Sequence, residues 1–355
     1  MVSRTTSEHI TLAAVVLTAF VLFSPCRAAT VRVPLDQPTI GEGIDAATLG
    51  DTVLVAPGVY TGSLNRDLAA PGLAVVSESG SELTVIDCEN EGRAFSFGSH
   101  WSAHAEIAGF TIGNASPPFG EPPYIGGGMY LGGPVTVRSC VFEDCYGGTY
   151  GGGIDCYENA SIIDCEFYRC ISVYGGGLSI GGWSRVENCL FVDNRAYQKG
   201  GGIRAAGLTP VGGETVIEGC TLVGNTAADG GGIYCWREVA NISHSVIAFN
   251  AGGGAVFCSD PEGDYVFSEN IVFGNEDGDS LCGDYYQNMF ADPLFCDLEW
   301  ESGGRRDLTV CSNSPCLPAN NDWGVQVGAF GEGCGECDSP VEGSTWGRLK
   351  ALYWE

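Results

Sequence analysis

Hydrophobic and polar residues alternate in short segments along most of this chain. An aliphatic residue follows each of six glycine-rich corners, the residue two positions on is again apolar or a cysteine, and the residue between them is mixed. This order of buried, outward and buried positions has a period of two, which is typical of a β-strand with one buried face. No stretch after residue 50 sustains the 3.6-residue period of a helix. The pattern therefore predicts an all-β chain.

The glycine-rich corners recur at a nearly constant spacing. They start at residues 126, 151, 175, 200, 230 and 253, which are 25, 24, 25, 30 and 23 residues apart. A second segment runs in step with them and is clearest at Cys140–Cys145 and Cys165–Cys170. A fixed period of this length indicates a repeat architecture. A unit of two short strands with glycine corners is one coil of a solenoid, since glycine turns the chain sharply without strain.

The second segment ends in an FxxN-like motif. The motif is complete in Phe191–Asn194, and cysteine takes the place of asparagine at Cys145 and Cys170. Degenerate copies are Leu222–Asn225, Ile247–Asn250 and Val272–Asn275. GGGI-like corners paired with FxxN-like segments resemble the repeats of right-handed parallel β-helix proteins of the pectin-lyase-like fold, including bacterial polymorphic outer-membrane proteins. The resemblance covers residues 31–330 and implies a triangular coil of three short parallel sheets.

The two ends of the chain differ from the repeats. Residues 1–28 are expected to be a secretory signal peptide, because Arg4 precedes the apolar stretch Leu12–Phe23 and a small-x-small cleavage site follows it. Residues 29–337 then form the β-helix domain. Its start carries a capping box, Thr39 with Glu42, which predicts an N-terminal capping helix over residues 38–50. Residues 291–337 are expected to form a disulfide-rich C-terminal cap, and residues 338–355 a linker and a short tail.

The formal net charge is −28, and the chain has only two lysines, Lys199 and Lys350. Such acidity excludes nucleic acid and anionic lipid as partners, because both attract basic surfaces. The apolar core of the signal is too short to span a membrane, and no other stretch is long enough. We therefore expect no transmembrane segment after signal removal, and a monomer that is secreted or displayed at the cell surface.

Seventeen cysteines are present, and sixteen remain after the signal is removed. An even count in an exported chain indicates disulfides, and cysteines at the same position of adjacent coils lie close enough to pair. The favoured pairs are Cys145 with Cys170 and Cys235 with Cys258. Further disulfide candidates are Cys311, Cys316, Cys334 and Cys337.

Two alternatives stay open for the cysteines. The last four candidates have the donor set of a four-thiolate zinc site, although an oxidising compartment favours disulfides. One column of four cysteines is equally well explained as stacked buried thiols that fill a narrow core. Its members are Cys140, Cys165, Cys189 and Cys220.

The mixed outward positions that follow the corners should stack along the rod. This column, with its aromatic, acidic and basic side chains, has the chemistry to contact a sugar chain. The candidate ligand-binding residues are Tyr130, Asp155, Arg204 and Tyr234, with Ser179 between them. An exposed ladder of this kind is more often a solvated strand face without a ligand. We therefore predict weak carbohydrate binding at most.

Catalytic motifs of enzymes with this fold are missing from the sequence. It has no Gly-His-Gly of polygalacturonase-like enzymes and no Asp-Phe-Ile-Phe-Gly of pectin-esterase-like enzymes. His244 is expected to be structural, and His100 and His104 near Trp101 are weak candidates for a metal or catalytic role. Arg204 could act as a lyase base only if its surroundings lowered its pKa.

We therefore expect a structural or binding protein without catalytic residues, cofactor or metal. Its partner would be a polysaccharide or another cell-surface component. The alternative is a polysaccharide lyase or glycoside hydrolase that acts on acidic polysaccharide.

Overall fold

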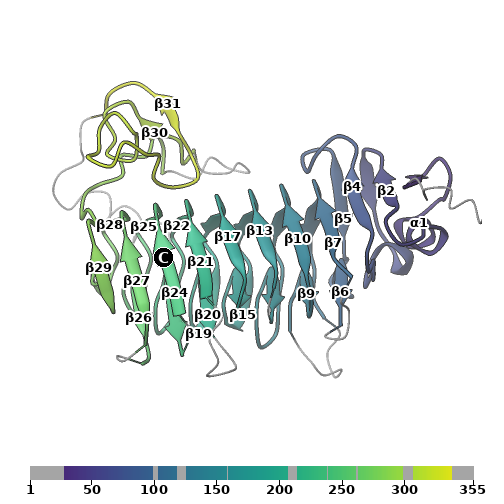
Figure 1. Ribbon diagram of the computed structural model, residues 1–355, viewed down its shortest axis with the longest axis horizontal. Helices are drawn as coiled ribbons and strands as arrows, with labels where there is room; N and C mark the ends of the chain where they lie inside the picture. The colour runs from purple at the N-terminus through teal and green to yellow at the C-terminus, as the bar shows by residue number, and fades with distance from the viewer. Residues whose placement is uncertain are drawn as a thin grey trace, which may run out of the picture.

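A computed structural model describes residues 28–98, 103–117, 125–157, 159–206, 214–237, 239–260, 263–298 and 307–337. Most of the expected signal peptide, His100 with Trp101, and the expected tail at 338–355 lie outside these ranges. The described strands form three long parallel sheets that wind into a right-handed β-helix (Figure 1). The predicted all-β, right-handed parallel β-helix is confirmed.

The three sheets run along the rod side by side, and their strands follow in order. Sheet A consists of β1 (Thr30–Val33), β2 (Thr52–Val55), β4 (Ala74–Ser77), β7 (Ala105–Ala108), β10 (Val135–Arg138), β13 (Ser161–Ile163), β17 (Arg185–Glu187), β21 (Glu214–Glu218), β24 (Val239–Ser243), β27 (Tyr265–Ser268) and β29 (Asp284–Tyr286). Sheet B consists of β3 (Gly58–Tyr60), β5 (Thr84–Asp87), β8 (Thr111–Gly113), β11 (Val141–Glu143), β14 (Glu166–Tyr168), β18 (Leu190–Val192), β22 (Thr221–Val223), β25 (Val246–Ala248) and β28 (Ile271–Phe273). Sheet C consists of β6 (Phe95–Phe97), β9 (Met129–Leu131), β12 (Ile154–Cys156), β16 (Leu178–Ile180), β20 (Ile203–Ala206), β23 (Ile233–Trp236) and β26 (Val256–Cys258). A short pair, β15 (Ile171–Tyr174) with β19 (Arg195–Lys199), forms a corner between sheets B and C.

The aliphatic residues that follow the glycine corners stack inside the rod. Ile154 pairs in register with Leu178, Leu178 with Ile203, and Ile203 with Ile233. All four side chains are fully buried. The expectation of one internal column from the period-two pattern is confirmed, and it fixes which side chains of sheet C point outward.

Each glycine triplet combines a conformational need with a steric one. The first glycine has a positive φ, which is 59° at Gly151, and this region is accessible to glycine without strain. The third packs beneath an inward side chain of sheet B, which is a phenylalanine ring at Gly128, Gly153 and Gly177, so that a Cβ on Gly153 would lie 2.6 Å from the Phe167 ring. Phe167 stacks between Phe142 and Phe191 with ring centroids 4.9 and 4.6 Å apart. The triplets therefore allow the coils to pack around a continuous phenylalanine stack.

The asparagines of the FxxN-like segments form a buried ladder. The Asn194 amide nitrogen donates to Asn225 Oδ1 at 2.9 Å and to the Phe167 carbonyl at 2.9 Å. Asn225 repeats this pattern with Asn250, and Asn250 with Asn275. The ladder satisfies backbone groups at the corner after sheet B, where the chain leaves the regular hydrogen bonding of a strand.

The predicted disulfide between Cys145 and Cys170 is wrong. Both thiols are free and buried, and their Sγ atoms face the carbonyls of Ile112 and Phe142 in the preceding coil, at 3.5 and 3.6 Å. Stacked side chains in a parallel coil point in the same direction, whereas a disulfide needs its two Cβ atoms to turn toward each other. The thiols instead take up the ladder position that asparagine holds later in the chain.

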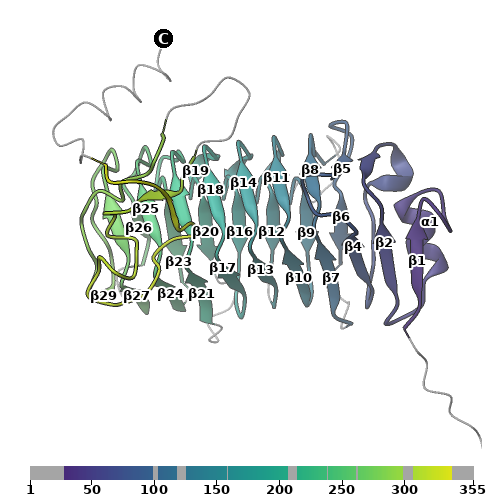
Figure 2. The same ribbon diagram turned by 90° about the horizontal axis from the view of Figure 1, so that it is seen from above.

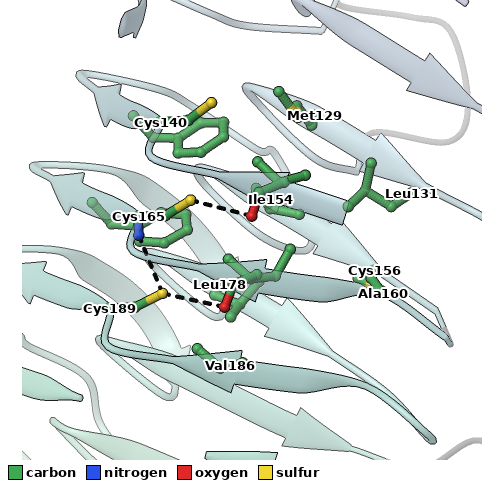
Figure 3. Close-up of a cluster of buried hydrophobic side chains, with 14 of the residues drawn as sticks. Met129, Leu131, Cys140, Ile154, Cys156, Ala160, Cys165, Leu178, Val186 and Cys189 are labelled. Atoms are coloured by element: carbon green, nitrogen blue, oxygen red, sulfur yellow. Dashed lines mark hydrogen bonds between the residues drawn. The ribbon is translucent and has the colours of Figure 1, made fainter. Parts of the chain in front are cut away.

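The column of four cysteines behaves in the same way. Cys140, Cys165, Cys189 and Cys220 are free and fully buried, and Figure 3 shows the first three on successive coils. Burial raises the pKa of the Cys140 thiol well above its usual value. The alternative of stacked buried thiols is the one that the structure supports.

A seven-residue helix, α1 (Ile40–Ala46), lies at the N-terminal end of the rod (Figures 1 and 2). Thr39 caps it, since its Oγ1 accepts a hydrogen bond from the Glu42 backbone at 3.2 Å. Ile40 and Ile44 are buried against the first coil. The helix is shorter than the predicted 38–50 but covers the end of the apolar stack as expected. Within the described ranges no helix has the length and apolar character needed to cross a membrane.

The closing segment packs on the side of the rod. It carries β30 (Val310–Cys311) and β31 (Glu332–Cys334) and lies over the outer face of sheet B near β22, β25 and β28 (Figure 1). Leu308, Val310, Leu317 and Val327 pack there against outward residues such as Val223 and Val246. Two hydrogen bonds fix its position, from Gly328 N to the His244 carbonyl and from Ala329 N to Thr221 Oγ1.

Three disulfides lie toward the C-terminus. They join Cys258 to Cys282, Cys296 to Cys334 and Cys311 to Cys337. The predicted pair of Cys235 with Cys258 is therefore wrong, because Cys235 is sealed in the core and Cys258 bonds to the following coil instead. Cys316, another candidate, is a buried free thiol beside the Pro293 carbonyl. Cys311, Cys334 and Cys337 do form disulfides, as expected.

Candidate functional site

The outward column of sheet C lies as the sequence predicts, one residue on each successive coil. Backbone register pairs its members in the order Tyr130, Asp155, Ser179, Arg204, Tyr234 and Phe257. Three of them are nearly inaccessible to solvent, with exposed fractions of 4% for Asp155, 2% for Ser179 and 2% for Tyr234. The column is therefore not a solvated strand face, because large side chains from the neighbouring corners cover it.

A small cleft opens over the middle of this column. Its volume is about 50 Å³, which is room for roughly four water molecules. Asp155, Ser179 and Arg204 come from the strands beneath it, and Tyr150 and Tyr157 come from the two corners beside β12. The site thus combines a polar floor with aromatic walls, as small-molecule sites commonly do.

Asp155 is the group in the cleft whose pKa is most clearly shifted by its surroundings. Burial raises the pKa of Asp155 to about 6, although hydrogen bonding from Ser179 and the charges of Arg204 and Arg93 oppose the shift. Its Oδ2 atom is buried and has no hydrogen-bond partner among the described residues. A buried acceptor without a partner is costly, so this atom is a position where a ligand donor would be stabilised.

Arg204 lies on the other side of Ser179. Its Nη1 donates a hydrogen bond to Ser179 Oγ at 3.2 Å, and its guanidinium carbon lies 4.8 Å from the centre of the Tyr150 ring and 5.9 Å from that of Tyr174. Burial lowers the pKa of Arg204. The two tyrosine rings stack 5.2 Å apart and hold the guanidinium in place over the strand.

Aromatic side chains extend the site in both directions along the rod. Toward the N-terminus, Tyr130 meets Tyr157 edge to face at 6.2 Å. Toward the C-terminus, Tyr234 stacks on Phe257 with ring centroids 5.8 Å apart, and Lys199 Nζ donates a hydrogen bond to the Tyr234 hydroxyl at 2.9 Å. All four predicted residues therefore lie in one continuous column, in which Asp155 and Tyr234 are covered by neighbouring side chains.

Several residues of the site were not predicted. Tyr150, Tyr174 and Lys199 each directly precede a glycine triplet, and this position places them at the corner beside sheet C. Arg93 is also near Asp155 and donates from Nε to the carbonyls of Ile125 and Gly126. Repetition of a large polar residue just before the glycines was the signal that could have identified the first three.

The other candidate sites have structural explanations. His244 Nε2 lies 2.6 Å from Glu269 Oε2, in keeping with the structural role expected of it, and His104 contacts Thr136 on an exposed surface. The sulfur atoms of Cys296, Cys311 and Cys334 lie within 4.8 Å of one another. All three are bonded in disulfides, so they do not offer the thiolates that a zinc site requires.

Comparison with known proteins finds similarity only among solved structures. No family model and no curated protein matches the sequence. Among solved structures, pectin methylesterase PemA from Erwinia chrysanthemi is similar, with 12% identity and a TM-score of 0.39 over 74% of this chain and 92% of that chain. A pectin methylesterase in complex with hexasaccharide VII has 14% identity and a TM-score of 0.34 over 74% of this chain and 80% of that chain.

Proposed function

We propose that this protein is an exported β-helix, secreted or displayed at the cell surface as a monomer, that binds a carbohydrate chain along the outer face of sheet C. The observation that carries the proposal is the cleft itself, with an unpartnered carboxylate oxygen of Asp155 between aromatic walls. Sugar hydroxyls supply the donors that this oxygen lacks, and sugar rings pack on tyrosine faces. The three disulfides support an oxidising, extracellular location.

The spacing of the column supports a chain-like ligand. Tyr130 and Tyr234 lie four coils apart with the cleft between them, which is about 19 Å at the spacing of neighbouring strands. A ligand that contacts Tyr130 at one end and the Phe257 ring stacked on buried Tyr234 at the other must therefore be several sugar residues long. Lys199 and Arg204 place positive charge on this face of a strongly acidic protein, so an acidic polysaccharide fits better than a cationic one.

The test is a binding screen with pectate, alginate and a neutral glucan, measured by calorimetry and by retardation in polysaccharide-containing native gels. Replacing Tyr130 and Tyr234 together by alanine should weaken binding at least about tenfold, since it removes the aromatic contact of Tyr130 and the ring that supports exposed Phe257, and each aromatic contact contributes on the order of 1 kcal/mol. Tyr285→Ala is the matched control, because Tyr285 is exposed on sheet A. Absence of binding to every polysaccharide, or equal weakening by the control, would contradict the proposal.

A second candidate is a polysaccharide lyase that acts on acidic polysaccharide. The observation that favours it is the position of Arg204 in the cleft, with Nη1 3.2 Å from Ser179 Oγ, where burial lowers the pKa of Arg204 in the direction that a base requires. The same screen tests it if ultraviolet absorbance is followed. A lyase forms unsaturated products from pectate or alginate, and Arg204→Ala should abolish their formation. Binding without unsaturated products would support the binding proposal and contradict the lyase candidate.

A further inference from the structure

Ser179 links the two charged residues of the cleft. It lies between Asp155 and Arg204 in the register of sheet C, where its Oγ accepts the hydrogen bond from Arg204 Nη1 at 3.2 Å. Hydrogen bonding from the Ser179 hydroxyl stabilises the Asp155 carboxylate. One hydroxyl therefore stands between an acidic group and a guanidinium at the floor of a cleft.

This arrangement supplies the three parts that acyl transfer from an ester needs. A serine hydroxyl is a weak nucleophile until an adjacent base takes its proton. The negative charge that develops on the ester oxygen then needs a fixed donor or cation close by. Arg204 provides such a group, because it already contacts Ser179 Oγ and is held by Tyr150 and Tyr174.

Asp155 meets the requirement for the base. An ordinary aspartate binds a proton too weakly to serve well near neutral pH, whereas a base with a pKa near that of histidine, about 6.5, is suited to it. Burial raises the pKa of Asp155 to about 6. Above that pH the group is ionised and ready to accept a proton, with Oδ2 lacking any partner among the described residues.

The size of the cleft limits the ester. A volume of about 50 Å³ is small, so the cleft suits a short acyl group such as acetyl better than a long one. The alcohol part extends out of the cleft along the column toward Tyr130 or Tyr234. The acyl group is thus selected by the cleft, and the alcohol by the surface already proposed to bind a sugar chain.

We propose that this cleft hydrolyses short acyl esters of a carbohydrate, with Ser179 as nucleophile, Asp155 as general base and acid, and Arg204 as the group that stabilises the oxyanion. The proposal shares the cleft with the proposed carbohydrate binding and adds a reaction to it. Ser179, Asp155 and Arg204 do not form a known esterase sequence motif, so their proposed roles rest on their arrangement in the cleft.

The reaction balances with water as the only co-substrate. Ser179 Oγ bonds to the ester carbonyl carbon while its proton passes to the Asp155 carboxylate, and Arg204 stabilises the tetrahedral oxyanion. The bond to the alcohol oxygen then breaks, and that oxygen takes the proton from Asp155. Water attacks the acyl-serine, gives a proton to Asp155, and the proton returns to Ser179 Oγ as the carboxylic acid leaves.

The proposal predicts a rate that rises with pH through about pH 6 as Asp155 ionises. The charged and titratable groups that face Asp155 are Arg93, Tyr130, Tyr157 and Arg204. The two arginines keep their charge through this range, and burial raises the pKa values of both tyrosines above their usual 10. The rise near pH 6 therefore belongs to Asp155.

The experiment uses the purified full chain with p-nitrophenyl acetate, p-nitrophenyl octanoate and a fluorophosphonate probe, which labels activated serines. Acetate should be hydrolysed in preference to octanoate, and peptide mapping should place the label on Ser179. Ser179→Ala should lower kcat/KM at least about 100-fold, and Arg204→Gln about 100-fold. Ser161→Ala is the matched control, since Ser161 lies on the outer face of β13 in sheet A, and it should leave the rate unchanged.

The outcomes separate this inference from carbohydrate binding. Label at a residue other than Ser179, or hydrolysis that survives Ser179→Ala, overturns the ester-hydrolase proposal even when the polysaccharide still binds. Hydrolysis that depends on Ser179 in a protein that binds no polysaccharide supports the reaction and contradicts the proposed function. Mapping the label on the unmodified protein keeps the test decisive even if a variant fails to fold.

Discussion

At the scale of single residues, Asp155 is a carboxyl group held away from water on the outer face of a strand. Its pKa is about 6 in the folded chain, compared with 3.8 for an unperturbed aspartate. The folded state therefore binds a proton more tightly than the unfolded state between these two values. Folding stability from this group is fully present below pH 3.8 and is lost as the pH rises through about 6.

Asp155→Asn should remove this pH dependence. A difference of about two pKa units corresponds to about 3 kcal/mol of unfolding free energy, so the variant should be more stable than the parent at pH 7 and similar at pH 4. Urea unfolding at both pH values measures it. Asp164→Asn, at an exposed position, is the control for simple loss of charge. An unchanged difference between pH 4 and pH 7 in Asp155→Asn would contradict the assignment.

The candidate site was predictable where the chain follows a strand. Tyr130, Asp155, Arg204 and Tyr234 were found because period two and a constant repeat fix both their face and their neighbours. The burial of Asp155 was not predictable, because the covering side chains come from corners whose path has no simple period. The perturbed pKa and the cleft follow from those corners, so they required the structure.

At the scale of elements, the asparagine ladder connects four coils through side-chain amides that bond to one another and to the backbone. Asn225 is fully buried. Its Oδ1 accepts from the backbone and amide nitrogens of Asn194, and its own amide donates to the Phe191 carbonyl and to Asn250. The asparagine of each coil thus provides hydrogen-bond partners for buried backbone and side-chain groups of the preceding coil.

Asn225→Ala should be strongly destabilising. It leaves several buried donors and acceptors without partners, at about 1–3 kcal/mol for each group that no water can reach. We expect a loss of about 2–5 kcal/mol in unfolding free energy, measured by urea denaturation. A loss below about 1 kcal/mol would mean that the ladder contributes little beyond its packing.

The repeated elements were predictable and the disulfides were not. Equivalent strands were placed correctly because the same apolar pattern recurs in each coil. The predicted disulfide between Cys145 and Cys170 was wrong because equivalent positions in adjacent repeats do not fix the direction of the side chains. The stacked thiols face backbone carbonyls of the preceding coil instead. The disulfides of the closing segment depend on the irregular path of its backbone. The sequence has no periodic pattern from which this path could be predicted.

At the scale of the whole molecule, the cysteines divide into two populations along the rod. Ten described cysteines are buried thiols outside any disulfide, and six form three disulfides toward the C-terminus. The regular coils, with their continuous apolar core, hold all of these thiols except Cys316, which is buried in the closing segment. The disulfides lie at the last strand of sheet C and in the closing segment, where less apolar surface is buried and a crosslink contributes more.

Thiol titration should reveal these two populations. The folded protein without its signal should expose almost no reactive thiol, the denatured and unreduced protein about ten, and the denatured and reduced protein all sixteen. Reaction with Ellman's reagent gives the three counts. Sixteen thiols in the unreduced protein taken from its native compartment would refute the disulfides.

The columns of buried thiols have a consequence for how such a chain matures. The thiolate of a cysteine that is still unfolded in an oxidising compartment can attack any neighbouring disulfide, and ten of these residues end in the native fold as thiols outside the three disulfides. The yield of native protein therefore depends on whether the coils stack faster than their thiols are oxidised. Production in an oxidising host should trap mispaired chains, and slow translocation should increase their share.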